Sequence, residues 1–140
     1  MDLNKILPVV LAGGKSKRFG EDKSQAKLGE KILIDYILSE LVEEFKEVLI
    51  VANDPIKHLS SNKIIKIDDF KKNLGPLGGI LSAMKWVKDK RKSYQWIASF
   101  PSDTPFFKTN ILNNFLKKIN EKESELFFMT FNEKRHNIFG

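Results

Sequence analysis

The stretch ILPVVLAGG, residues 6–14, decides which fold the rest of the sequence can form. Its first six residues are apolar and rich in β-branched side chains, and two adjacent glycines end the run. A short apolar run closed by glycines predicts a buried strand of a parallel sheet. Because glycine has no Cβ, the paired glycines would let the backbone pass close to a flat base or a phosphate group.

Apolar runs and amphipathic stretches alternate along the rest of the chain. Apolar residues spaced by three and four positions predict helices, and short β-rich runs predict strands. The predicted strands cover residues 6–11, 48–51, 63–67, 96–100 and 126–131, and the predicted helices cover residues 32–45, 80–87 and 111–119. A glycine-rich loop is expected over residues 73–79, and Thr109 is a suitable N-cap for the last helix.

This alternation predicts a three-layer α/β/α sandwich with a mostly parallel, Rossmann-like sheet. The length of 140 residues suits one domain, so we expect a single domain over residues 1–140. The open sheets of this class bind their ligands at the carboxyl ends of the strands. The loops that follow the predicted strands are therefore the places to look for a site.

The composition excludes several classes of protein. Hydrophobic residues make up 41% and charged residues 30% of the chain, which argues against disorder. The absence of cysteine excludes disulfides, thiolate metal sites and cysteine nucleophiles. The N-terminal apolar run is too short for a signal peptide, and no segment is long enough to span a bilayer. We therefore expect a soluble cytoplasmic protein with no membrane partner.

The net charge of +6 favours anionic partners, and residues 13–23, GGKSKRFGEDK, look like a phosphate-binding loop. A Walker A loop needs a glycine five residues before that of Gly-Lys-Ser, but Val9 occupies this position. A G-x-G-x-x-G fingerprint fails because Gly13 and Gly14 are adjacent. What remains is Leu-Ala-Gly-Gly-x-x-x-Arg-x-Gly followed by Asp-Lys, in which Arg18 and Lys23 are candidate phosphate ligands. The competing interpretation is a glycine turn followed by solvated cations.

Two further segments carry unusual residues. GPLGGI, residues 75–80, follows the acidic pair Asp68 and Asp69, and FPSDTPF, residues 100–106, follows a predicted strand. Asn53 lies just beyond another predicted strand. The plainer alternatives are an exposed acidic pair, an aspartate that opens a proline turn at Asp103, and an Asx turn at Asn53.

In order and approximate spacing, these three segments resemble the Leu-Ala-Gly-Gly, Gly-Pro-Leu-Ala-Gly and Pro-Cys-Asp-x-Pro motifs of the molybdenum cofactor guanylyltransferases, members of the nucleotidyltransferase superfamily. The resemblance runs from about Val9 to the C-terminus. Gly78 stands where the family usually has Ala, and Ser102 stands where it often has Cys. Family members extend beyond residue 140 through a segment with an Asn-x-Asn-Thr-Pro motif. The resemblance thus implies that the chain lacks the family's C-terminal segment.

The resemblance implies a Mg²⁺-dependent enzyme that transfers GMP from GTP to molybdopterin, forms molybdopterin guanine dinucleotide and releases pyrophosphate. The implied catalytic residues are Arg18, Lys23 and Asp103, and Asp103 is the implied Mg²⁺ ligand. The implied nucleotide-binding residues are Leu11, Ala12, Gly13, Gly14, Lys23, Asn53, Asp69, Gly78 and Asp103. Whether Asp68 or Asp69 contacts the nucleotide stays open. The expected partners are GTP and the molybdopterin acceptor, with molybdoenzymes or other cofactor-biosynthesis proteins as candidate protein partners.

Two alternatives remain. A related nucleotidyltransferase could use CTP, or a sugar or polyol phosphate as acceptor, because sequence patterns resolve base and acceptor contacts poorly. A non-catalytic nucleotide-binding or RNA-binding module would also use the positive charge. However, basic and aromatic residues are not interleaved as they are in RNA-binding modules, so we expect no nucleic-acid partner.

Overall fold

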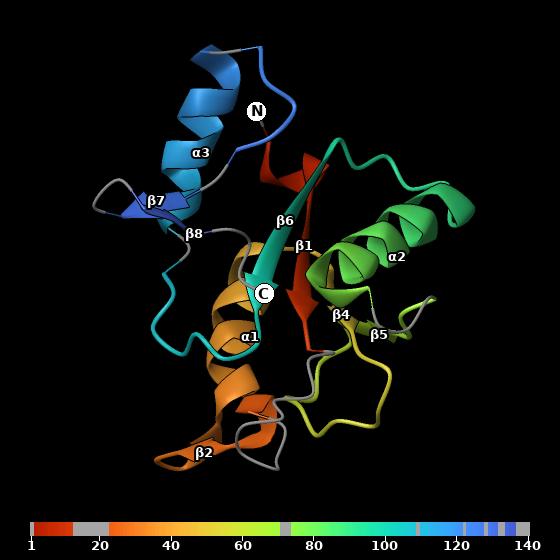
Figure 1. The fold of residues 1–140 in the computed structure, drawn as a ribbon, viewed down its shortest axis with the longest axis vertical. Helices are drawn as coiled ribbons and strands as arrows, with labels where there is room; N and C mark the ends of the chain where they lie inside the picture. The colour runs from red at the N-terminus through yellow and green to blue at the C-terminus, as the bar shows by residue number, and fades with distance from the viewer. Residues whose placement is uncertain are drawn as a thin grey trace.

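A four-stranded parallel sheet forms the centre of the fold (Figure 1). The computed structural model describes residues 2–12, 23–70, 74–108, 110–121, 123–127, 129–131 and 134–136. The sheet has the order β5-β4-β1-β6, and its strands are β1 (Ile6–Leu11), β4 (Val48–Val51), β5 (Ile64–Ile67) and β6 (Trp96–Pro101). Leu11 of β1 lies opposite both Val51 of β4 and Pro101 of β6, so the strands end together at one edge.

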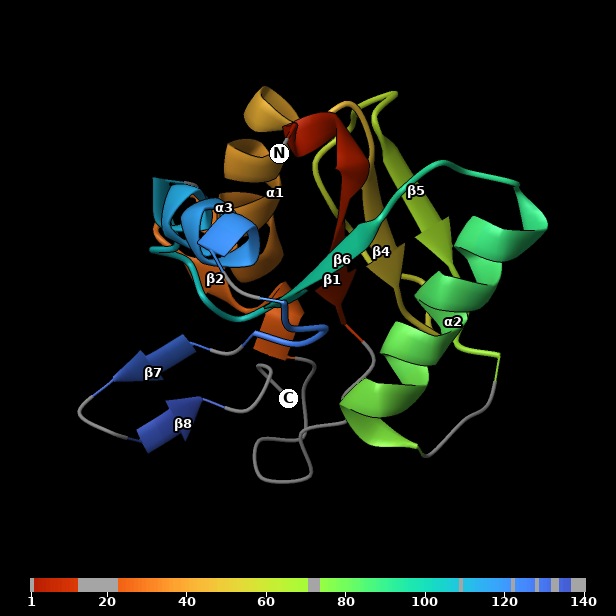
Figure 2. The same ribbon diagram turned by 90° about the horizontal axis from the view of Figure 1, so that it is seen from above.

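Helices cover both faces of this sheet (Figure 2). One face is covered by α1 (Leu33–Glu44) and α3 (Asn110–Glu121), and the other by α2 (Gly75–Asp89). Side chains of β1 alternate between the two cores: Ile6 and Val10 pack on the α1 side, and Leu7 and Val9 pack on the α2 side. A strand buried on both faces must be apolar throughout, as β1 is. The expected three-layer α/β/α sandwich is confirmed.

The order of the strands identifies one special position at the edge of the sheet. From β1 the chain passes through α1 to β4 and then to β5, whereas α2 carries it back to β6 on the other side of β1. The direction in which the sheet grows therefore reverses between β1 and β6. Open α/β sheets bind ligands in the crevice outside the carboxyl ends of the strands at such a reversal.

The predicted strands over residues 6–11 and 48–51 match β1 and β4, and the other two central strands differ from prediction by one residue. The predicted glycine-rich loop was wrong over residues 75–79, because α2 begins at Gly75. Pro76 lies in the first turn, where the missing N–H has no intrahelical acceptor to lose. Gly75 has φ of 63°, a conformation that glycine adopts without strain.

The last predicted strand, residues 126–131, was also partly wrong. Leu126 and Phe127 are not in a strand, whereas β7 (Met129–Phe131) pairs antiparallel with β8 (Lys134–His136) in a separate two-stranded sheet. Two short 3-10 helices and a second hairpin were not predicted: η1 (Leu3–Lys5), η2 (Lys23–Gln25) and the paired strands β2 (Lys27–Leu28) and β3 (Lys31–Ile32). Within the described residues, no helix is both long and apolar enough to cross a membrane.

The packing of α1 on the sheet can be tested at one of its buried leucines. Leu41 of α1 is fully buried, whereas Leu77 of α2 is 69% exposed. Leu41→Ala should lower the free energy of unfolding by about 2–5 kcal/mol, because it removes buried methyl groups and leaves a cavity. Leu77→Ala, the matched control, should change it by less than about 0.5 kcal/mol. Urea unfolding followed by circular dichroism measures both, and equal effects of the two changes would contradict the assigned core.

Candidate nucleotide-binding site

The loops that leave β1, β4 and β5 are tied together at their first residues. The Ala12 N–H donates to the Val51 carbonyl at 3.0 Å, and the Ala52 N–H donates to the Ile67 carbonyl at 3.0 Å. The sheet pairing thus continues one residue beyond β1 and β4. Ala12 is buried and Leu11 is half-buried, so the end of β1 is largely covered by its neighbours at this edge.

Asp69, beyond the end of β5, is held by residues from two other elements. Its backbone N–H donates to Asn53 Oδ1 at 3.0 Å, and its Oδ1 accepts the hydroxyl hydrogen of Ser82 at 2.8 Å. Asn53 follows β4, and Ser82 lies on α2. The structure therefore brings together two of the residues expected at the site, Asn53 and Asp69.

Asp68 has different surroundings from its neighbour. Its side chain is 75% exposed, and its Oδ1 lies 3.1 Å from the ammonium of Lys66 on β5. Since Lys66 and Asp68 are two positions apart, they lie on the same side of the extended chain. Asp68 thus pairs with a lysine at the surface, whereas Asp69 is bonded to Asn53, another residue expected at the site.

Two glycines of α2 allow the helix to approach this edge closely. A Cβ added to Gly79 would lie 2.7 Å from Leu11 Cδ2. A Cβ added to Gly78 would lie 2.7 Å from the Cβ of Leu74 and 3.3 Å from Asp69 Oδ2. Gly78 was expected to act from a loop, but it lies one turn into a helix, beside the Asp69 carboxylate.

Asp103 lies on the exposed turn after β6, on the other side of β1 from Asp69. Adjacent strands are about 4.8 Å apart, so the ends of β5 and β6, three spacings apart, are separated by about 14 Å. Asp69 and Asp103 therefore flank the end of β1. A ligand that contacts both must extend across it.

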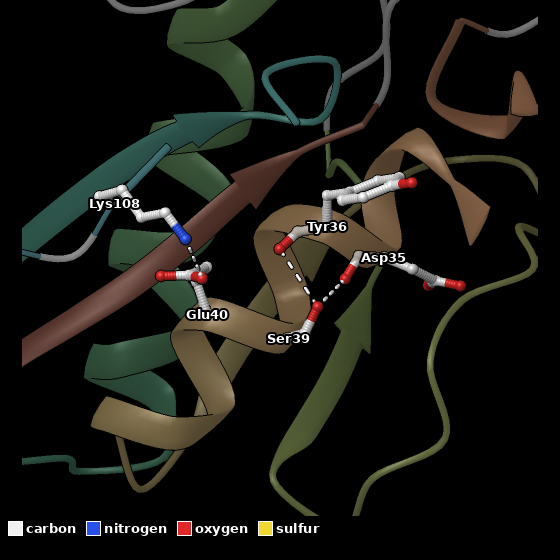
Figure 3. Close-up of polar contacts among 5 residues, drawn as sticks. All are labelled: Asp35, Tyr36, Ser39, Glu40 and Lys108. Atoms are coloured by element: carbon white, nitrogen blue, oxygen red, sulfur yellow. Dashed lines mark hydrogen bonds and ion pairs between the residues drawn. The ribbon is translucent and has the colours of Figure 1, made fainter. Parts of the chain in front are cut away.

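The segment that carries Asp103 is fixed at both ends. At its start, the Thr104 hydroxyl donates to the Pro101 carbonyl at 3.3 Å. At its end, the Phe107 ring packs edge-on against Phe100, with centroids 4.8 Å apart. The ammonium of Lys108 lies 2.9 Å from Glu40 Oε1 on α1 (Figure 3). These contacts hold the segment of Asp103 near the carboxyl end of β6, next to the end of β1.

Several expected site residues lie outside what the structure describes. Gly13, Gly14 and Arg18 belong to the undescribed residues 13–22, and the side chain of Lys23 is likewise outside the described part. The backbone of Lys23 begins η2. Two residues on, Gln25 Nε2 donates to the Lys57 carbonyl at 3.0 Å, and the Lys57 N–H donates to Gln25 Oε1 at 2.9 Å. These bonds join η2 to the loop after β4, on the carboxyl side of the sheet.

The described residues offer few ligands for Mg²⁺. Among the described residues, no group of three or more His, Cys, Asp or Glu side chains is arranged to hold a metal ion. Asp103 offers one exposed carboxylate. Because Mg²⁺ is usually bound through one or two carboxylates together with substrate phosphates, these residues fit an ion shared with a triphosphate.

Comparison with known proteins identifies the family of this chain. Residues 8–139 match the model of the MobA-like NTP transferase domain. The chain belongs to this family. The membership confirms the resemblance carried by the three sequence motifs.

Curated MobA-like relatives are longer than this chain. The molybdenum cofactor guanylyltransferase of Haemophilus influenzae is 31% identical over 136 residues, which cover 96% of this chain and 68% of the relative. The probable molybdenum cofactor guanylyltransferase of a Geobacillus species is 32% identical over 124 residues, which cover 86% of this chain and 61% of the relative. The chain thus spans between 61% and 68% of the length of these two relatives.

Solved structures share the fold of this MobA-like chain. The homologue of Mycobacterium tuberculosis Rv0371c from Mycobacterium sp. strain JC1 has a TM-score of 0.63 at 21% identity, covering 81% of this chain and 58% of that one. The 4-diphosphocytidyl-2C-methyl-D-erythritol synthase of Anaerococcus prevotii has a TM-score of 0.55 at 11% identity, covering 95% and 62%. At these identities the likeness concerns the fold alone.

Sequence reasoning missed Ser82, Gly79 and Gln25 as residues that shape this edge. Ser82 follows Gly78 by four positions and so lies on the same face of α2. The run GPLGGILS, residues 75–82, contained this signal once it was read as a helix. Gln25 had no recognisable pattern around it.

The bond between Asn53 and Asp69 gives a prediction for stability. Asn53→Ala should lower the free energy of unfolding by about 1–3 kcal/mol, because the half-buried Asp69 N–H loses its acceptor. Asn62→Ala, in the exposed turn before β5, serves as the control and should have little effect. Urea unfolding of both variants measures the difference. If Asn53→Ala unfolds with the same free energy as the unchanged chain, the bond between Asn53 and Asp69 does not contribute to stability.

Proposed function

We propose that this MobA-like protein transfers GMP from GTP to molybdopterin, forming molybdopterin guanine dinucleotide and releasing pyrophosphate. The observation that carries the proposal is that Asp69, just beyond the end of β5, is bonded to both Asn53 and Ser82 at the edge where the carboxyl ends of the strands meet. The names of the curated relatives support the choice of reaction.

The base would lie beside Asp69. A carboxylate accepts two hydrogen bonds, and guanine presents two adjacent donors, N1–H and N2–H₂. Adenine and cytosine do not offer this pair to a carboxylate. The Asn53 bond fixes the backbone of Asp69, and the Ser82 bond orients its carboxylate. Asp68 is the weaker candidate because it pairs with Lys66 at the surface.

The phosphates would extend from this position past the end of β1 toward Asp103. The chemical obstacle is repulsion between an anionic acceptor phosphate and the triphosphate, so the site must supply positive charge and alignment. Arg18 would hold phosphate oxygens with its planar fork, and Lys23 would do so as a point charge. The net charge of +6 would also attract the anionic substrates.

Asp103 would hold Mg²⁺ together with the phosphates. Bound there, the ion would neutralise charge on the phosphate oxygens and on the departing pyrophosphate. The contacts of Thr104, Phe107 and Lys108 support this role, because they hold the segment of Asp103 near the carboxyl end of β6. Leu11 and Ala12 would contact the nucleotide through their backbone groups.

Nucleotide selectivity tests the assignment of the base. With Mg²⁺ present, the chain should bind GTP more tightly than CTP or ATP in calorimetric titrations. Asp69→Asn should weaken GTP binding about tenfold or more, because an amide N–H₂ would face the guanine donors, and it should leave CTP and ATP unchanged. Equal affinity of the unchanged chain for all three nucleotides would sink the guanine assignment.

Asp68→Asn is the matched control for this experiment. It removes the same charge one residue away, and we expect it to leave all three affinities unchanged. The reverse pattern, with GTP weakened by Asp68→Asn and not by Asp69→Asn, would move the base contact to Asp68.

The metal assignment is tested through Asp103→Asn. In the unchanged chain, GTP should bind more tightly in Mg²⁺ than in EDTA, and Asp103→Asn should remove most of this difference because the amide is a poorer ligand. Asp89→Asn, at the distant end of α2, should keep the difference. A Mg²⁺ effect that survives Asp103→Asn in full would refute the role of Asp103.

A further inference from the structure

We propose that Ser82 is a positioning residue for guanine, acting through Asp69. The inference rests on the function proposed above, in which Asp69 accepts hydrogen bonds from the base. Ser82 is one of the few buried polar residues of the described chain, with 3% of its surface exposed. Its position in the middle of α2 places it under the loop that follows β5.

The hydroxyl of Ser82 joins three groups. Its oxygen lies 2.8 Å from Asp69 Oδ1, accepts the Phe70 N–H at 3.0 Å, and lies 2.9 Å from the Gly78 carbonyl. The hydroxyl has one hydrogen to donate. Asp69 is the preferred acceptor, since hydrogen bonds to a charged carboxylate are about twice as strong as bonds to a neutral carbonyl.

These bonds fix the loop after β5 at two consecutive residues. The Asp69 N–H is held by Asn53, and the Phe70 N–H is held by Ser82. The first anchor comes from the loop after β4, and the second comes from α2. The backbone that carries the Asp69 side chain is therefore held by two separate elements.

Ser82 also sets the rotation of the Asp69 carboxylate. Two parallel hydrogen bonds to guanine require the plane of the carboxylate to coincide with the plane of the base. A bond to Oδ1 restrains rotation about the last side-chain torsion, which is broad for Asp in the absence of such a contact. Gly78, on the same helix as Ser82, lies close to the Asp69 carboxylate. A Cβ added there would lie 3.3 Å from Oδ2 and 3.5 Å from Oδ1.

The geometry thus assigns separate tasks to two residues. Asp69 would supply the acceptor atoms, and Ser82 would hold them in the orientation that only guanine matches. Loss of the Ser82 hydroxyl would remove the bond to Oδ1 and so widen the range of orientations open to the carboxylate plane. Discrimination between bases would fall more than the affinity for the triphosphate, which depends on other residues.

Two changes at Ser82 test this inference. Ser82→Ala removes the hydroxyl, and Ser82→Cys keeps nearly the same size with a much weaker hydrogen-bonding group. Each should lower the ratio of GTP affinity to ATP affinity about tenfold in calorimetric titrations with Mg²⁺, mainly through GTP. A purely structural role would weaken both nucleotides alike and leave the ratio unchanged. Full selectivity in either folded variant would overturn the proposal.

Ser39→Ala is the matched control. Ser39 is a helical serine whose hydroxyl bonds to the backbone of α1, at the Asp35 and Tyr36 carbonyls (Figure 3). Its loss removes a hydroxyl of the same kind without touching the loop after β5. We expect this variant to keep both the GTP-to-ATP ratio and the exchange behaviour of that loop.

Hydrogen exchange of the ligand-free chain tests the contact without nucleotide. The Phe70 amide should exchange at least about tenfold faster in Ser82→Ala, because its acceptor is gone. Unchanged exchange would overturn the positioning role. If Asp69→Asn lowers GTP selectivity and the Ser82 changes do not, the positioning inference fails and the proposed function stands. If the unchanged chain shows no preference for GTP, the guanine assignment fails, and the exchange of Phe70 still decides whether Ser82 holds the loop.

Discussion

The pairing of β1 on both edges is the constraint on which the rest of the structure depends. β1 bonds to β4 and to β6 in parallel register, and its side chains enter the cores on both faces. A buried strand must satisfy its backbone groups through its neighbours, so both partners are required. Because all three strands run the same way, their last residues meet at one edge. The loops after β1, β4, β5 and β6 are gathered there by this pairing, and the candidate site consists of their first few residues.

Close approach of α2 completes this edge. Gly79 lies against Leu11 with no room for a Cβ between them, and Gly78 lies against Asp69. A Cβ at Gly79 would require the Leu11 side chain to move, and a Cβ at Gly78 would clash with Leu74 and crowd the Asp69 carboxylate. The two glycines therefore act through the absence of a side chain. This absence lets α2 lie close to the edge, where Asn53, Asp69 and Ser82 make their polar contacts.

The strands of the central sheet could be predicted because each is a short apolar run with clear ends. The start of α2 could not, since Gly and Pro have the lowest helix propensities and four of the first five residues of α2 are Gly or Pro. The hairpin β2–β3 could not be predicted because its two-residue strands are too short to show a periodicity, and each contains a lysine. Here tertiary packing overrides the local signal.

The site was predictable in its outline and not in its details. Leu11 ends a strand, and Asn53, Asp69 and Asp103 follow strands. Parallel strands bring such positions to one edge of the sheet, so this gathering could be predicted from the order of the elements. The difference between Asp68 and Asp69 depends on which side chain meets Lys66 and which meets Ser82, and both residues look alike in the sequence. Ser82 itself stands alone in an amphipathic helix, where a single serine is usually solvated or incidental.

The two anchors at the far end of the Asp103 segment respond differently to ionic strength. The Lys108–Glu40 pair is at the surface, with side chains 67% and 30% exposed, and pairs of this kind contribute about 0–1 kcal/mol and weaken as salt is added. The edge-on contact of Phe100 and Phe107 carries no net charge and is not screened. Concentrated salt therefore weakens the ion pair and leaves the ring contact, so at high ionic strength the end of the Asp103 segment depends mainly on Phe107.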